Sequence, residues 1–286
     1  MRIDILTLFP EMCNTVMNES IIGRAQKSGK VEIVCTNIRD FSGNKHNKVD
    51  DMPYGGGMGM VMSAQPIYDC YKSLYNEGEE KPHLVYLSPK GKTFNQQKAI
   101  ELSKLPRLVL LCGHYEGVDQ RVLDEIVDEE ISIGDYVLTG GELPALTVAD
   151  AVCRMLPGVL SDDLCFQDES HFSGLLEYPQ YTRPAVWNDR AVPEILLSGD
   201  HKKIDEWRRC KSILTTIDKR PDMLSECDLS PKDKRLLEKY KSFLHLHKLL
   251  QNELHRLPSE KYSFPAILLA LPTSFDSRIP SDIHLH

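Results

Sequence analysis

The chain has 286 residues, of which 41% are hydrophobic and 27% are charged, and its formal net charge is −8. This length allows one large domain or two smaller ones, and the composition is that of an ordinary globular protein. No apolar run reaches the ~20 residues of a membrane span, and the first ten residues lack the layout of a signal peptide. We therefore expect neither a membrane protein nor a secreted one.

The first half of the chain alternates between two kinds of segment. The apolar runs typical of buried strands are residues 3–9, 31–35, 83–87, 108–112 and 131–133. The segments with helical spacing are residues 11–27, 65–75, 95–103, 120–127 and 143–156. This alternation predicts an α/β domain with a mostly parallel sheet.

The second half has a different composition. Residues 161–173 hold Asp, Gln, Ser and His with few apolar side chains, which is typical of a linker. Helical spacing returns at residues 204–213 and 232–250 and predicts a small helical domain. The predicted organisation is an α/β domain at 1–160, a linker at 161–173, a helical domain at 174–250 and a tail without assigned role at 251–286.

The charge is unevenly distributed. Residues 200–261 contain fifteen Lys or Arg and eleven Asp or Glu, a local net charge of +4 on an otherwise acidic chain. Such a segment could meet a phosphate backbone, although charge alone favours an ordinary solvated helical face.

The cysteines indicate a compartment. Eight of them are scattered along the chain without a Cys-x-x-Cys pair, so the sequence offers no zinc ligand set. Scattered cysteines in apolar runs are typical of free thiols in a reducing cytoplasm. We therefore expect a cytoplasmic protein.

Three glycine-bearing turns follow three of the predicted strands, at residues 87–91, 112–117 and 133–142. Loops after parallel strands gather at the carboxyl edge of the sheet, and glycine lets the backbone approach a ligand closely. One such turn is commonplace, but three that converge could form an adenine slot lined by Leu87, Ile133, Leu138 and Pro144. Neither a Gly-x-Gly-x-x-Gly fingerprint nor a Walker A motif is present, which disfavours dinucleotide-dependent oxidoreductases and P-loop NTPases.

A further glycine cluster at residues 50–60 follows the basic stretch 45–48. Its composition fits a flexible loop that closes on a nucleotide and fits a plain surface loop equally well.

Taken together, these motifs resemble the bacterial tRNA (guanine-N1)-methyltransferases of the SPOUT class. The resemblance runs from residue 1 to about 245, and the tail exceeds the usual length of the family. The motifs that carry it are Asp50-Asp51-x-Pro53-Tyr54-Gly55-Gly56-Gly57-x-Gly59-Met60, Leu87-Ser88-Pro89-x-Gly91, Cys112-Gly113-x-Tyr115-Glu116-Gly117, Ser132-Ile133-Gly134-Asp135-Tyr136-Val137-Leu138-x-Gly140-Gly141-Glu142 and Tyr181-Thr182-Arg183-Pro184.

The resemblance implies a deep trefoil knot in the sheet, which no spacing argument could show because knots are rare exceptions to chain topology. It also implies a homodimer whose sites lie at the subunit interface, with the linker as a lid. The implied reaction is the methylation of N1 of guanosine 37 in tRNA after a preceding guanosine. S-adenosyl-L-methionine is the implied methyl donor, a magnesium ion of unassigned position is expected, and tRNA is the expected partner rather than DNA or a membrane.

The resemblance assigns site residues by position. The implied cofactor contacts are Tyr86, Leu87, Ser88, Pro89, Gly91, Gly113, Tyr115, Glu116, Gly117, Ser132, Ile133, Gly134, Asp135, Tyr136, Val137, Leu138, Gly140, Gly141 and Pro144. The implied substrate contacts are Asp50, Tyr54, His114, Ser170, Arg183, Lys202 and Arg208. Some family members have Arg in place of His114, so a phosphate contact there is expected to be weaker or pH-dependent.

The chemistry needs a proton acceptor and a cation. Guanine N1 carries a proton, so a carboxylate must accept it while a cation stabilises charge on O6. Glu169 stands where the family has an Asp, with Asp168 before it in reversed order, and either carboxylate could be the base. Arg154 matches the family's arginine for O6, and in its apolar stretch it must be paired or functional.

Two alternatives stay open from the sequence. One is a ribose 2′-O-methyltransferase of the same SPOUT class, which would not need a carboxylate for N1. The other is a catalytically silent RNA-binding protein, against which the glycine turns and Arg154 argue.

Overall fold

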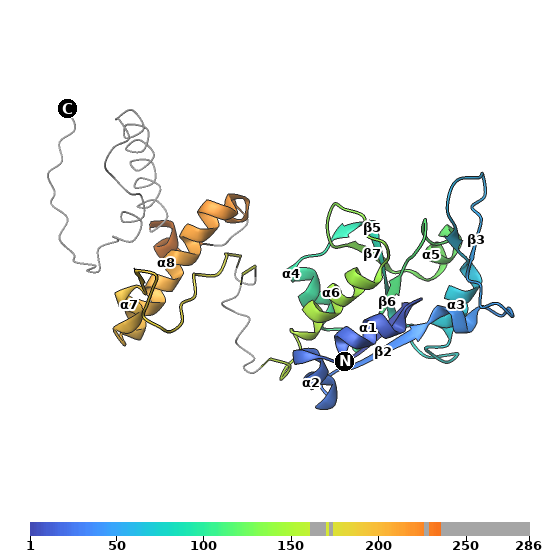
Figure 1. Cartoon of the computed structure of the whole chain (residues 1–286), viewed down its shortest axis with the longest axis horizontal. Helices are drawn as coiled ribbons and strands as arrows, with labels where there is room; N and C mark the ends of the chain where they lie inside the picture. The colour runs from blue at the N-terminus through green and yellow to red at the C-terminus, as the bar shows by residue number, and fades with distance from the viewer. Residues whose placement is uncertain (161–169, 172–173, 226–228, 236–286) are drawn as a thin grey trace. The chain divides into compact units, whose positions relative to one another are not determined.

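The computed structural model describes residues 1–160, 170–171, 174–225 and 229–235 of the chain. The chain divides into two units, Met1–Gln167 and Asp168–His286, and each is described by itself (Figure 1). The boundary falls inside the segment predicted as a linker, most of which lies outside the described residues, as does the tail at 251–286. No helix within the described residues has both the length and the apolar character that a bilayer crossing requires.

The first unit is built on a five-stranded parallel sheet. Its order is β2-β1-β6-β5-β7, and every neighbouring pair is parallel. The strands are β1 (Arg2–Thr7), β2 (Glu32–Asn37), β5 (His83–Thr93), β6 (Arg107–Cys112) and β7 (Glu129–Ser132). The predicted α/β domain with a mostly parallel sheet is therefore confirmed, and each of the five predicted strands is present.

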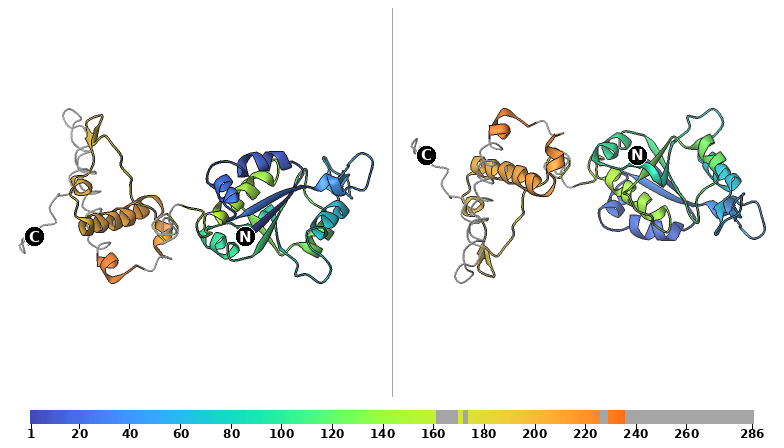
Figure 2. Two further views of the ribbon diagram at one scale, coloured as in Figure 1. Left: turned by 90° about the horizontal axis from the view of Figure 1, so that it is seen from below. Right: turned by 90° about the horizontal axis from the view of Figure 1, so that it is seen from above.

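Helices cover both faces of this sheet (Figure 2). Because both faces are covered, alternate residues of a strand enter different apolar layers: Leu108 and Leu110 join one core, and Val109 and Leu111 join the other. The helices of the first layer are α1 (Pro10–Met17), α2 (Ser20–Lys27), α4 (Gln96–Leu102) and α6 (Glu142–Cys153), and those of the second are α3 (Ala64–Lys72) and α5 (Gln120–Ile126).

The prediction of a single helix at residues 11–27 is wrong, because α1 ends before α2 begins. The backbone N–H groups of Asn18 and Glu19 bond to carbonyls of the last turn of α1 and close that helix. Gly23 of α2 then lies so close to the carbonyl of Asn18 that a side chain at Gly23 would clash. No proline marks the break, and the glycine that allows it lies four residues later.

The carboxyl edge of the sheet carries two irregular features. Leu87 and Lys92 both pair with Ile131, so residues 88–91 leave the ladder and β5 resumes after them. The 3₁₀ helix η1 (Ile38–Phe41) follows β2, and a short hairpin of β3 (Asp50–Asp51) and β4 (Val61–Met62) encloses the glycine-rich loop. Irregular backbone is thus concentrated at one edge of the sheet.

The amino edge carries a buried carboxylate. The side chain of Asp4 in β1 is fully buried and accepts hydrogen bonds from Arg2 and from Arg107, the latter at 2.7 Å from Nε. Arg107 also donates to the carbonyl of Leu74. The arrangement ties the starts of β1 and β6 together.

Replacing Asp4 with alanine is expected to lower the free energy of unfolding by about 2 kcal/mol, because two guanidinium groups lose their charged partner and hydrogen bonds to charged groups each contribute roughly 1.5–3 kcal/mol. Partial exposure of both arginines keeps the loss at the lower end. The control is Glu101→Ala, which breaks the exposed pair of Glu101 with Lys98 and should cost under about 1 kcal/mol. Urea unfolding followed by circular dichroism measures both losses, and equal losses would contradict the role of burial.

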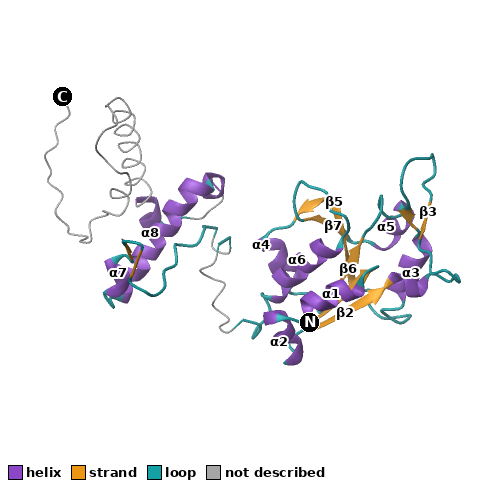
Figure 3. Ribbon diagram, viewed as in Figure 1, coloured by secondary structure: helices purple, strands orange, loops and turns teal. Residues whose placement is uncertain are grey.

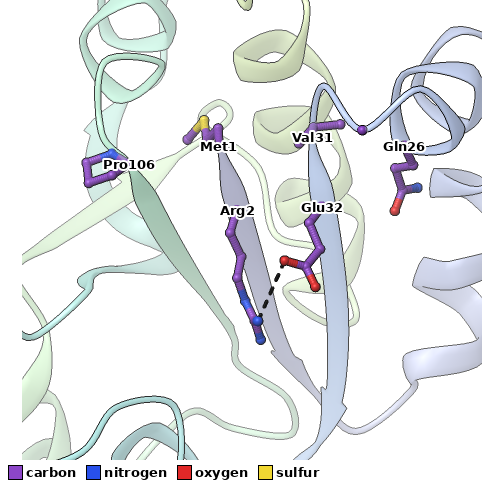
Figure 4. A pocket seen from close by; sticks show the side chains of 7 residues that line it. Met1, Arg2, Gln26, Val31, Glu32 and Pro106 are labelled. Carbon is purple, nitrogen blue, oxygen red and sulfur yellow. Dashed lines mark ion pairs between the residues drawn. The ribbon is translucent and has the colours of Figure 1, made fainter.

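A shallow pocket of about 550 Å³ also lies at this amino edge. Figure 4 shows Arg2 beside Glu32 there, with their ion pair at 3.7 Å. The lining residues are Met1, Arg2, Gln26, Gly29, Val31, Glu32 and Pro106. None of them is a predicted site residue, and the strands begin rather than end here.

The second unit contains a hairpin and helices (Figure 3). Its long helix α8 buries Ile213 against Leu175 and Leu229. The predicted helix at 204–213 lies within α8, and most of the predicted helix at 232–250 falls outside the described residues. The elements are β8 (Val186–Trp187), β9 (Arg190–Ala191), α7 (Glu194–Leu197), α8 (His201–Lys219) and the 3₁₀ helix η2 (Pro221–Ser225).

The cysteines that the structure describes are free thiols: Cys13, Cys35, Cys70, Cys112, Cys153 and Cys210. Burial raises the pKa of Cys70 and of Cys153 to about 12, so both stay protonated at neutral pH. Cys165 and Cys227 lie outside the described residues.

Candidate functional site

The first turn, residues 87–91 within β5, is pressed against the neighbouring strand β7. A side chain at Gly91 would begin 2.5 Å from backbone atoms of Glu130 and Ile131, so only glycine fits at this point. Ser88 is buried, and its hydroxyl accepts the N–H of Lys90 at 3.2 Å. Pro89 and Lys90 are exposed. The turn therefore presents a small exposed tip on a rigid base.

The second turn, after β6, meets the first through Tyr86. A side chain at Gly113 would begin 2.8 Å from the hydroxyl of Tyr86, which lies in β5 directly before the first turn. Burial, together with the negative charge of Glu130, raises the pKa of Tyr86 to about 12, so its hydroxyl remains a hydrogen-bond donor. Tyr115 has a φ of 60°, the left-handed conformation that lets the chain reverse before Gly117.

The third turn, after β7, returns to the second. The N–H of Gly141 donates to the carbonyl of Gly113 at 2.8 Å, and Gly140 forms a bridge with His114. A side chain at Gly141 would begin 2.7 Å from the Cα of Cys112. The three predicted turns thus lie at the carboxyl edge of the sheet, where the second and third are joined by a backbone hydrogen bond and the first is linked to the second through the Tyr86 side chain.

The residues between β7 and Gly140 form the open part of this turn. Ser132 is buried, and its hydroxyl donates to the carbonyl of Gly134. Asp135, Tyr136, Val137 and Leu138 are all exposed, and Val137 is 82% exposed. Apolar side chains in such a position are available to a flat apolar ligand.

The residues expected to line the adenine slot differ in exposure. Leu87 is buried, and Ile133 packs against the same core, so both form the floor of this region rather than its rim. Leu138 is exposed, and Pro144 near the start of α6 is half-buried.

The glycine-rich loop is attached to the second turn at its base. The N–H of Glu116 donates to the carbonyl of Met60 at 3.0 Å, and the N–H of Met62 donates to the carbonyl of Gly117 at 2.9 Å. Asp50 is half-buried in β3, whereas Tyr54 at the tip is 99% exposed. The loop that carries β3 extends away from α3 and α5 in Figure 1. Nothing in the sequence indicates the contact of this loop with residues 116–117.

Arg154 lies at the opposite end of α6 from Gly141. It is half-buried directly after the helix, and its N–H bonds to the carbonyl of Asp150. A helix of twelve residues is about 18 Å long. Within one chain, α6 therefore separates Arg154 from the glycine turns at its start.

The remaining predicted substrate residues belong to the second unit. The Ser170 hydroxyl accepts the N–H of Glu177, Arg183 and Lys202 are exposed, and the Arg208 guanidinium lies 5.1 Å from the centre of the Tyr178 ring. Asp168 and Glu169 lie outside the described residues. In the part of the chain that the structure describes, no three His, Cys, Asp or Glu side chains lie together as metal ligands.

Three further residues at this edge were not predicted as site residues. The carboxylate of Glu142 accepts the hydroxyl of Thr7 at 2.8 Å, across 135 positions of sequence. Arg39 in η1 donates to the hydroxyl of Tyr115 at 3.1 Å. An acid directly after Gly140-Gly141 was a visible signal for Glu142, whereas nothing in the sequence marks Thr7 or Arg39.

The part of the chain that carries this edge is similar to known proteins. Residues 1–226 match the family model described as tRNA (Guanine-1)-methyltransferase TrmD. The chain is 61% identical over 226 residues to a protein of Ruminiclostridium cellulolyticum named tRNA (guanine-N(1)-)-methyltransferase, covering 79% of this chain and 97% of that protein. Proteins with the same name are 57% identical over 247 residues in Alkaliphilus oremlandii and 49% identical over 241 residues in Staphylococcus aureus, covering 85% and 84% of this chain and 99% and 98% of those proteins.

Proposed function

Because the chain belongs to the tRNA (guanine-1)-methyltransferase family, we propose that it transfers a methyl group to N1 of a guanosine in tRNA. The proposed target is guanosine 37 when another guanosine precedes it, and the proposed compartment is the cytoplasm. The observation that carries the proposal is the meeting of three glycine turns at one sheet edge, within the matched residues.

The proposed methyl donor is S-adenosyl-L-methionine, and the turns fit such a group. Gly91, Gly113 and Gly141 pack closely against their neighbours above an apolar floor, and exposed tips of the turns such as Pro89 and Leu138 suit an adenine and a short apolar chain. When bound, this group supplies a methyl carbon on a positively charged sulfur. The proposed contacts are the cofactor residues named from the resemblance, with Tyr86 and Tyr115 on the first two turns.

The protein's own contribution is a proton acceptor and a cation. We assign the acceptor at guanine N1 to Glu169, with Asp168 as the second choice, and the donor to O6 to Arg154. Removal of the N1 proton places negative charge on the base, and a guanidinium beside O6 stabilises that charge. The target base must leave its stack to reach these groups, and Asp50, Tyr54, His114, Ser170, Arg183, Lys202 and Arg208 are the proposed contacts to the RNA.

We also propose a homodimer in which Arg154 of one copy serves the turns of the other. Two observations support it. The length of α6 separates Arg154 from the turns of its own chain. An apolar stripe of Met12 and Val16 on α1, Phe9 directly before it and Leu143 at the start of α6 is 42–50% exposed and suits a second copy.

The finer fold assignments belong to the same proposal. A deep trefoil knot is supported by the path after β7, which returns from the edge of the sheet to Gly113 before α6 begins. The helical character of residues 174–250 is supported by α8. A magnesium ion remains part of the family resemblance, but the described residues do not gather a ligand set, so no step is assigned to it.

The test is methylation of tRNA transcripts that differ only at positions 36 and 37. We expect 1-methylguanosine in digests of the transcript with guanosine at both positions, and at least tenfold less when either guanosine is replaced. Methylribose in the digest would identify a ribose 2′-O-methyltransferase instead. Binding of tRNA without methyl transfer would identify a silent RNA-binding protein.

A further inference from the structure

A buried carboxylate stands at the start of α6. Glu142 follows Gly140 and Gly141 directly and is only 4% exposed. Burying a carboxylate is costly unless it is hydrogen-bonded, and Glu142 accepts the Thr7 hydroxyl through Oε1 at 2.8 Å. Thr7 is the last residue of β1, is fully buried, and accepts the N–H of Phe9 at 2.9 Å. The pair therefore joins the end of β1 to the third turn.

The second oxygen of Glu142 lies beside Gly140 of the third turn. A side chain at Gly140 would collide with Oε2 of Glu142 and would also begin 2.7 Å from Nδ1 of His114. That Nδ1 is buried and has no hydrogen-bond partner in the structure. The His114 ring packs against Phe9 and Tyr115, with ring centres 5.1 Å and 4.9 Å apart. Glu142 and His114 thus both approach Gly140 at the point where a side chain would begin.

The charge of Glu142 also acts on Cys112: burial together with that charge raises the pKa of the Cys112 thiol well above its ordinary value. No Lys or Arg of the described chain forms an ion pair with Glu142. A negative charge at the start of a helix is favourable by itself. However, that effect does not account for the hydrogen bond that Glu142 accepts from Thr7 at the end of β1.

We propose that Glu142 is a positioning residue for methyl transfer. Through the hydroxyl of Thr7 it fixes Gly140 and Gly141 against Gly113 and His114, and so sets the spacing between the second and third turns. This inference rests on the proposed function, because the turns matter only if they hold the methyl donor. It adds two residues, Thr7 and Glu142, to those proposed for the site.

The test compares Thr7→Val, which removes the hydroxyl at nearly constant shape, with Thr7→Ser, which keeps it. Calorimetry with S-adenosyl-L-methionine gives Kd, steady-state kinetics give KM and kcat, and thermal melting reports stability. We expect Thr7→Val to raise Kd and KM for the methyl donor about tenfold, with a smaller change in kcat, as loss of a hydrogen bond to a charged group predicts. Thr7→Ser should stay within about twofold of the wild type for the same reason.

Glu142→Gln keeps the shape of the side chain and removes its charge, so it should also weaken binding of the methyl donor. The double variant with Thr7→Val should bind no worse than Thr7→Val alone, because both changes act on one contact. If both single variants melt earlier but bind S-adenosyl-L-methionine with unchanged Kd, the role is only structural and the proposal is overturned. If the wild-type protein itself does not bind this compound, the proposed function fails and takes this inference with it.

Discussion

Replacing Gly141 with alanine is expected to weaken binding of S-adenosyl-L-methionine on the order of 100-fold. The added methyl group would begin 2.7 Å from the Cα of Cys112 and 2.8 Å from the backbone nitrogen of Gly113. Both atoms belong to the backbone that ends β6, so neither can rotate aside as a side chain could. The second and third turns must then separate, and overpacking of about 1–3 kcal/mol corresponds to a loss of this size.

The control is Gly78→Ala. Gly78 has a φ of 92° and nothing within 4 Å of its would-be side chain, so alanine there strains the backbone without a collision. Calorimetry should find its affinity unchanged, and circular dichroism should find both variants folded. Equal affinities for the Gly141 variant and the wild type would show that the close contact of the turns is not part of the binding site.

Replacing Glu169 with glutamine is expected to reduce kcat by about 10²–10⁴-fold, the range typical of a lost general base. Affinity for the methyl donor should stay within about twofold, because only the group that accepts the N1 proton changes. Single-turnover methylation of the transcript with guanosine at positions 36 and 37 measures the effect on the chemical step.

Asp168→Asn is the matched control for this prediction. Its kcat should fall by no more than a few-fold if Glu169 is the base. The opposite result, a large loss in Asp168→Asn and little change in Glu169→Gln, would assign the proton transfer to Asp168. That outcome would also mean that the proton acceptor is the first of the two acids, Asp168, and not the acid at position 169, where the family has its Asp.

Continuous apolar runs identified the five strands of the sheet, because strands covered on both faces are almost uniformly apolar. The meeting of the three turns followed from the rule that loops after parallel strands share one edge. Three details could not be foreseen, because each depends on a partner distant in sequence. Leu87 and Lys92 both pair with Ile131, Glu116 bonds to Met60, and Thr7 reaches Glu142.

The site itself was predictable only in part. The glycines were assigned by their resemblance to a family motif. The structure supplies a physical reason for several of them, because neighbouring atoms leave no room for a side chain at these positions. Arg154 was expected inside an apolar helix face, whereas it caps the end of that helix half-exposed. Its distance from the turns could have been estimated by counting residues along the helix once the helix limits were known.

The length of α6 has a consequence for mixed assemblies. In the proposed homodimer, each reaction centre draws its glycine turns from one copy and its arginine from the other. A copy damaged at the start of α6 and a copy damaged after its end would therefore complement each other, since one of the two centres in the mixed pair would keep both intact halves. Neither damaged copy could achieve this by pairing with itself.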